Sequence, residues 1–335
     1  MNPRAEAQAK AGEAYDARVL EPSPPAVGVG PWFADDPVAR DGAVRPVLSP
    51  VSSGDATWES LAADDPALAA WCRERWLGPY PALAAVPASY EATRLALHAV
   101  AEQMLKPARE RANGKFGLRW VRGGFGTPYF GDDAQVSVRG ATLNVVRAGE
   151  RTGTPLTSLA AAAQALGDLA GEATQPAAES EPATSGSAAS AAMRLGASLS
   201  TDLLPIDEAA ASFIGDWFGF AYCVLEELRA RATEAQAPSR VQIWPEHFDA
   251  ALELGDEAAG ARAAYGCSSG DEHHPEPYLY VAPWTARPTG ALWNAQGFAG
   301  AELLYADLLA AEDPRTLALE FFGDRVEALR DTGTP

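Results

Sequence analysis

Residues 207–232, with the sequence DEAAASFIGDWFGFAYCVLEELRARA, predict a long helix that opens the C-terminal half of the chain. Asp207 is a good N-cap, because its side chain can accept a hydrogen bond from a free backbone N–H group of the first turn. Apolar side chains then recur at helical spacing and predict one buried stripe, which comprises Phe213, Ile214, Trp217, Phe220, Cys223, Val224 and Leu228. We therefore expect this helix to belong to the hydrophobic core.

Alternating apolar residues after this helix predict strands, and a final helix follows them. We expect strands at about 240–254, 261–267, 277–284 and 298–308, and a helix over 314–329. The N-terminal half repeats the order. It has a helix over 89–113 that Pro107 kinks or ends, strands at 116–122, 135–139 and 142–146, a turn-rich loop at 123–128, and a helix over 158–169. The pattern predicts an α+β fold with antiparallel sheet and helices packed on one side, in two similarly ordered halves (helix–strands–helix).

Composition divides the chain further. Residues 1–30 are polar and rich in Ala and Pro, so we interpret them as a disordered N-terminal tail. Residues 31–170 form the N-terminal half, which starts with a segment rich in tryptophan that we expect to wrap against the folded body. Residues 171–203 are rich in Ala, Ser and Pro and predict a disordered linker. Residues 204–335 form the C-terminal half.

The charge of the chain excludes some classes of function. A formal net charge of −19 disfavours binding to nucleic acid or to an anionic membrane surface, because phosphate groups would be repelled. The three cysteines lie far apart without a CxxC pair, which argues against a disulfide framework and a cysteine-based zinc site. Neither an apolar leader nor a long apolar run is present, so we expect a cytoplasmic protein.

Histidine and carboxylate residues of the C-terminal half suggest one kind of site. On strand alternation His247 and Asp249 share one face, while Trp244 and Phe248 lie on the opposite, buried face. A loop farther along the chain adds His273 and His274. Because imidazole and carboxylate groups together suit a divalent metal, His247, Asp249, His273 and His274 are candidate metal ligands of a metal-dependent hydrolase or isomerase. Without a metal, His247 oriented by Asp249 could act as a general base.

Aromatic residues around the same strands suggest a second kind of site. An aromatic surface with a few polar groups is the usual composition of a ligand pocket. Our leading hypothesis is therefore a small-molecule binding protein, and the candidate ligand-binding residues are Trp244, Tyr278, Tyr280, Trp284 and Trp293. The third hypothesis is an interaction module whose acidic C-terminal half binds a basic protein. These alternatives leave open whether the chain is an enzyme.

Basic residues gather in the N-terminal half. Between residues 88 and 150 there are nine Lys or Arg and six Asp or Glu, against the acidic balance of the whole chain. Arg119 and Arg122 precede a glycine-rich loop at 123–126. Guanidinium groups bind carboxylates and phosphates through paired hydrogen bonds. The two arginines are further candidate ligand-binding residues. The loop itself matches neither a P-loop nor a dinucleotide-binding fingerprint.

Overall fold

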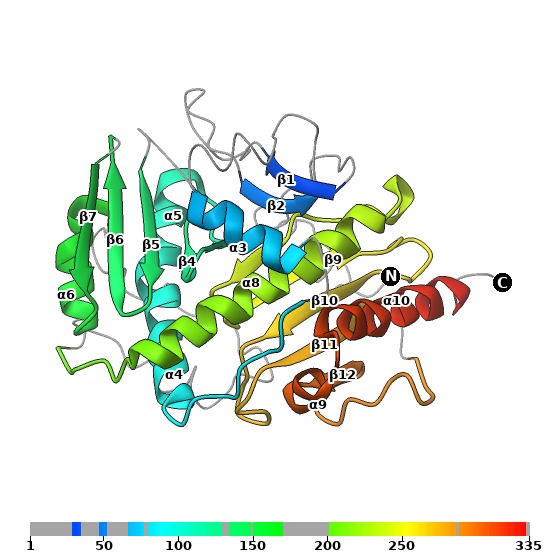
Figure 1. Cartoon of the computed structure of the whole chain (residues 1–335). Helices are drawn as coiled ribbons and strands as arrows, with labels where there is room; N and C mark the ends of the chain where they lie inside the picture. The colour runs from blue at the N-terminus through cyan, green and yellow to red at the C-terminus, as the bar shows by residue number, and fades with distance from the viewer. Residues whose placement is uncertain are drawn as a thin grey trace, which may run out of the picture.

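The computed structural model describes residues 29–34, 47–51, 66–76, 80–128, 134–148, 150–169, 201–285 and 288–332. Its strands form a two-stranded ribbon and two antiparallel sheets of five strands each, with helices packed around them (Figure 1). The predicted α+β class is confirmed. The two similarly ordered halves are confirmed as well, since a helix, five strands and a helix follow one another twice along the chain.

The elements have the following bounds. The N-terminal half contains β1 (Val29–Ala34), β2 (Val47–Val51), α3 (Pro66–Trp76), α4 (Tyr90–Val100), the π-helical turn η1 (Ala101–Leu105), α5 (Lys106–Asn113), β3 (Arg119–Val121), β4 (Gly124–Gly126), β5 (Gln135–Arg139), β6 (Thr142–Arg147), β7 (Glu150–Pro155), α6 (Leu159–Leu166) and the 3₁₀ turn η2 (Gly167–Leu169). The C-terminal half contains α8 (Glu208–Arg231), the 3₁₀ turn η3 (Glu234–Gln236), β8 (Gln242–Trp244), β9 (Asp249–Leu254), β10 (Ala263–Ser268), β11 (Tyr278–Pro283), β12 (Ala301–Leu304), α9 (Tyr305–Ala310) and α10 (Pro314–Thr332).

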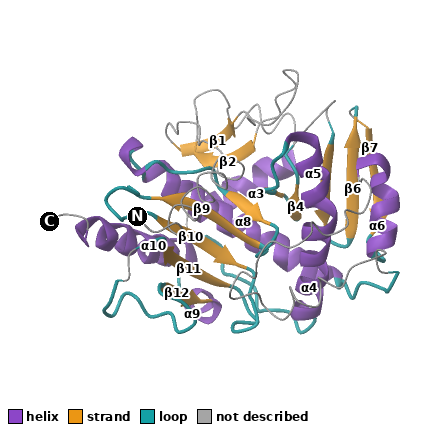
Figure 2. Ribbon diagram, turned by 180° about the vertical axis from the view of Figure 1, so that it is seen from behind, coloured by secondary structure: helices purple, strands orange, loops and turns teal. Residues whose placement is uncertain are grey.

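Both large sheets are meanders, in which each strand pairs with the next strand along the chain. The N-terminal sheet runs from β3 to β7 and the C-terminal sheet from β8 to β12, because short connections allow antiparallel neighbours. At the facing edges, Leu118 and Ile243 exchange two backbone hydrogen bonds of 2.7 and 2.9 Å. Helices α8 and α10 lie on the same face of the C-terminal sheet, and the view from behind shows the other face of that sheet (Figure 2).

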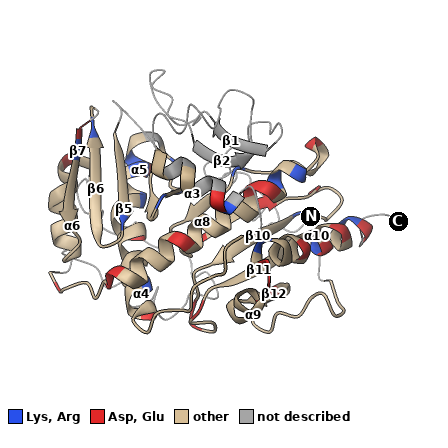
Figure 3. Ribbon diagram, viewed as in Figure 1, with Lys and Arg blue, Asp and Glu red and all other residues tan. Residues whose placement is uncertain are grey.

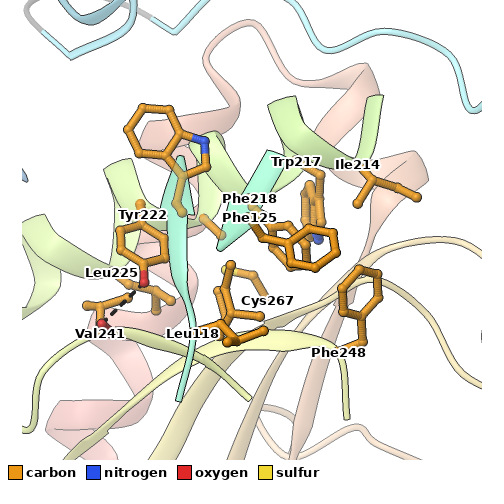
Figure 4. Close-up of a cluster of buried hydrophobic side chains, with 14 of the residues drawn as sticks. Leu118, Phe125, Ile214, Trp217, Phe218, Tyr222, Leu225, Val241, Phe248 and Cys267 are labelled. Carbon is orange, nitrogen blue, oxygen red and sulfur yellow. Dashed lines mark hydrogen bonds between the residues drawn. The ribbon is translucent and has the colours of Figure 1, made fainter. Parts of the chain in front are cut away.

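Helix α8 crosses both sheets and joins their cores. Asp207 caps it as predicted, since its carboxylate accepts a hydrogen bond of 3.0 Å from the Ala210 N–H. The predicted stripe is buried, but burial extends beyond one stripe and around most of the helix. The Phe218 ring stands edge-on to Phe125 of β4 and to Phe248 of the β8–β9 turn, with centroids 6.2 and 5.2 Å apart (Figure 4). One hydrophobic cluster therefore includes side chains of both sheets.

A glycine allows α8 to approach the N-terminal sheet closely. A Cβ atom at Gly215 would lie 2.4 Å from the backbone carbon of Gly123 and 2.6 Å from the backbone nitrogen of Gly124. The Trp120 indole N–H donates a hydrogen bond of 3.3 Å to the Gly215 carbonyl at the same crossing. The absence of a side chain at Gly215 thus sets how closely the helix packs on the β3–β4 turn.

The helix predicted over 89–113 is continuous, although it contains Pro107. A five-residue π-helical turn precedes the proline, because Pro107 has no N–H group to donate to the preceding turn and the wider turn accommodates the ring. His98 in α4 stacks on Phe248 at 5.5 Å, so this helix also contacts the C-terminal half. Burial there lowers the pKa of His98 to about 4, which keeps the imidazole neutral.

Several strand predictions need correction. The predicted strand over 240–254 is interrupted by a turn at 245–248, in which Phe248 has a positive φ of 54°. The glycine-rich loop at 123–126 contains strand β4, and β7 was not predicted because its sequence, ERTGTP, lacks apolar alternation. The predicted strand over 298–308 ends at Leu304 and continues as α9.

Most of the predicted tail (1–30) and nearly all of the predicted linker (171–203) lie outside the described residues. In the tryptophan-rich segment, the Trp71 ring lies 4.9 Å from that of Trp120. Within the described part of the chain, no helix has both the length and the apolar character required to span a bilayer.

Gly215→Ala tests the close approach of α8. We expect the added methyl group to lower the free energy of unfolding by about 1–3 kcal/mol, because backbone atoms cannot move aside as a flexible side chain can. Urea denaturation measures the change. Gly323→Ala in α10 is the matched control, since a Cβ atom there meets nothing within 4 Å and should stabilise the helix by roughly 0.5–1 kcal/mol. An equal gain at both positions would contradict the packing described above.

Candidate functional site

The outer face of the C-terminal sheet, which points away from α8, carries most of the predicted site residues. Asp249 pairs with Trp244 across β8 and β9 and with Ser268 across β9 and β10. Since directly paired residues share a face, Trp244 lies beside Asp249 on the outer face. The prediction from the sequence, which placed Trp244 on the core face, is wrong. The turn at 245–248 is the physical reason, because it reverses the chain between the two residues.

Aromatic side chains donate hydrogen bonds to two carboxylates on this face. The Tyr280 hydroxyl donates a hydrogen bond to Oδ2 of Asp249, and the Trp284 indole N–H donates one of 2.7 Å to Glu253. Asp249 is only 4% exposed and Tyr280 half-buried, so the pair is closed to a ligand in this conformation. Burial raises the pKa of the Asp249 carboxyl, and the nearby His247 and the Tyr280 hydroxyl offset this only in part.

The loop before β11 forms two similar pairs. The Tyr278 hydroxyl donates a hydrogen bond of 2.6 Å to Asp271, and His274 Nε2 lies 3.1 Å from Oε2 of Glu302. The hydrogen bonds on this face therefore connect its residues to one another. These side-chain hydrogen bonds reduce the cost of placing several carboxylates on one face of the sheet.

The four candidate metal ligands do not converge. His247 is exposed in the β8–β9 turn and Asp249 is buried beside it, whereas His274 pairs with Glu302 and His273 is exposed, 3.9 Å from a carboxylate oxygen of Asp271. Across the described residues, no group of three or more His, Cys, Asp or Glu side chains is placed to hold a metal ion.

The remaining candidates lie apart from this face. Trp293 is half-buried against the hydrophobic core. Arg119 is 3% exposed in β3, near the Tyr222 hydroxyl, while Arg122 is exposed in the β3–β4 turn. The two arginines therefore do not form a single anion-binding site.

A cavity lies elsewhere, between α8 and the extended segment formed by residues 80–87, which we call the strap. Its volume is about 530 Å³, and its lining comprises Arg75, the strap residues Tyr80, Pro81, Ala82, Leu83, Ala84, Ala85 and Pro87, the α8 residues Ala209, Ser212, Phe213, Asp216 and Trp217, and Tyr305. The lining of this cavity, the strap cavity, combines residues of both halves.

Hydrogen bonds hold the strap at several points. The Tyr80 N–H donates to Asp313 at 3.2 Å, and the Tyr305 hydroxyl donates to the Ala84 carbonyl at 2.7 Å. Beyond the strap, the Tyr90 N–H donates to the Pro87 carbonyl at 3.0 Å. The cavity is therefore bounded by a fixed segment of chain.

Three aromatic rings form the floor of the strap cavity. Tyr305 stands edge-on to Phe213 at 5.5 Å and to Trp217 at 5.6 Å. The Trp217 indole N–H is already bonded to the Ser268 carbonyl at 2.9 Å, so the ring is fixed in place. A rigid aromatic floor offers apolar contact to a ligand at little entropic cost.

Polar groups gather at one end of the cavity. Burial raises the pKa of the Tyr80 hydroxyl, and the charges of Arg75 and Asp216 act on it in opposite directions. Asp216 is exposed on the helix surface, but partial desolvation by its neighbours raises its pKa, and Arg75 and a hydrogen bond from Trp71 oppose the shift. Figure 3 shows that both acidic and basic residues occur along α8.

The α8 stripe that faces the cavity has the spacing of one helix face. Ala209, Ser212 and Asp216 are exposed. Apart from these three and Glu208, every residue of α8 from Glu208 to Glu226 is buried. The sequence predicted Phe213 and Trp217 as core residues, because aromatic residues at helical spacing usually are. The sequence feature that could have indicated a cavity beside this helix is the interruption of the apolar run by Ser212 and Asp216.

Asp249→Asn tests the buried carboxylate of the sheet. Because the pKa is raised in the folded state, wild-type protein holds the proton more strongly when folded and loses stability as the pH rises through that pKa. The amide of the variant does not titrate. We expect the stability of wild type relative to the variant to fall as the pH rises above the pKa of an unfolded aspartate, about 3.9, and to level off once the folded-state pKa is passed. Melting temperatures of both proteins across this range measure it, and parallel pH profiles would contradict the prediction.

Comparison with known proteins leaves the function to be argued from these side chains. A scan against protein-family models gives no match, and searches of curated proteins and of solved structures give none either.

Proposed function

We propose that this chain binds a small organic molecule in the strap cavity. The observation that carries the proposal is a cavity of about 530 Å³ with an aromatic floor and charged groups at one end. Small-molecule sites in proteins have volumes of about 300–1,000 Å³ and combine apolar walls with a few fixed polar groups. The proposal retains the binding function expected from the sequence and moves its site from the outer sheet face to α8.

The arrangement of the lining favours a ligand over an empty packing defect. The aromatic rings are held by contacts with one another and the strap by hydrogen bonds, so the site needs little reorganisation before binding. Ser212 and Asp216 bring a hydroxyl and a carboxylate to the same wall. Apolar contact would supply affinity, and these polar groups would set orientation.

Ala209→Trp tests the proposal by filling the cavity. Ala209 is exposed in the first turn of α8 and lines the cavity, so an indole can enter the space that a ligand would occupy. Saturation-transfer NMR with a library of aromatic fragments measures binding. We expect fragments to bind wild-type protein and to lose at least about tenfold in affinity, or about 1.4 kcal/mol, in the variant.

Ala310→Trp is the matched control. Ala310 is likewise an exposed alanine, at the end of α9, but does not line the cavity. The control should bind the fragments as wild type does. Equal binding by all three proteins would place the fragments elsewhere, and no binding to wild type would remove the proposed function.

A further inference from the structure

The strap cavity differs in chemistry between its two ends. Two ring contacts show that the strap and α8 run in opposite directions along it. Tyr80 packs edge-on to Phe220 at 4.9 Å, whereas Tyr90, just beyond the strap, packs on Phe213 at 5.2 Å. Arg75, Tyr80 and Asp216 thus share one end of the cavity. Ala209 and Pro87 lie toward the other end, which is apolar.

The charged end contains both signs. Asp216 supplies a carboxylate at the surface of the cavity, where its hydrogen-bond donor is the indole of Trp71. Arg75 supplies a guanidinium that is only 20% exposed and is stacked over the Trp71 ring at 4.6 Å. The Arg75 partner Glu74 is 61% exposed, and ion pairs with so exposed a partner are weak enough for a ligand carboxylate to replace.

We infer that the strap cavity takes a zwitterion with an apolar body, the chemistry of an apolar α-amino acid. Arg75 would bind the ligand carboxylate, Asp216 would bind the ammonium group, and the body would lie on the rings of Phe213, Trp217 and Tyr305. A ligand with a single charge would form only one of these two charge-assisted contacts and would therefore bind more weakly. The inference rests on the proposed function and specifies the ligand class for the same site.

Three probes with the same apolar body separate these contributions. L-Phenylalanine carries both charges, 3-phenylpropanoate lacks the ammonium group and 2-phenylethylamine lacks the carboxylate. Isothermal titration of the full chain at neutral pH should show L-phenylalanine binding about tenfold or more tightly than either analogue, the loss expected for one charge-assisted hydrogen bond.

Two variants assign the charges. Asp216→Asn should abolish the preference for L-phenylalanine over 3-phenylpropanoate, and Arg75→Gln should abolish the preference over 2-phenylethylamine. Asp307→Asn and Arg231→Gln remove exposed charges that do not line the cavity and should leave both preferences unchanged. Arg75→Lys keeps the charge and should retain part of the preference, which a variant that merely misfolds would not.

The outcomes distinguish the inference from the proposed function. If fragments bind in a manner that Ala209→Trp abolishes, but L-phenylalanine binds no better than its analogues or not at all, the zwitterion inference is overturned while the binding function stands. Preferences that survive in Asp216→Asn and Arg75→Gln would overturn it too. If neither fragments nor probes bind, the proposed function fails with it.

Discussion

The fold depends on the need to cover helix α8 on nearly all sides. From Ala210 to Leu228 buried side chains surround it, so no single sheet could bury the helix by itself. The two meanders, the β8–β9 turn and α10 share that role, and Gly215 allows the N-terminal sheet to come close enough. The strap completes the cover only in part, and the cavity lies where the exposed residues Ala209, Ser212 and Asp216 interrupt the buried surface.

Helix positions and the fold class could be predicted from the sequence, because they depend on local patterns. Asp207 caps α8 at the expected residue, and Ser158 caps α6 by accepting a hydrogen bond of 3.1 Å from the Ala161 N–H. Strand β7 could not be predicted, since it is held by its pairing with β6 and not by apolar alternation. The side of the sheet on which Trp244 lies depended on a turn that the alternating pattern had concealed.

For the candidate sites, too, local patterns could be predicted from the sequence and long-range contacts could not. Alternation correctly placed Asp249 opposite the core, yet it could not show that Tyr280 would bond to it and close the cluster. The strap cavity was not predicted because its walls come from residues separated by more than a hundred positions in the chain. Composition marks aromatic residues as buried, but only the packing of the strap on α8 determines that Phe213 and Trp217 also border a space.

The most direct test of the account is an NMR titration that compares the strap cavity with the outer sheet face. In methyl-labelled protein titrated with L-phenylalanine, Leu83 and Ala209 report on the cavity, while Ala251 and Ala264 report on the outer sheet face. If the ligand binds in the strap cavity, the methyl signals of Leu83 and Ala209 shift to saturation and those of Ala251 and Ala264 do not shift. Shifts confined to Ala251 and Ala264 would contradict the account and return the site to Asp249 and Tyr280.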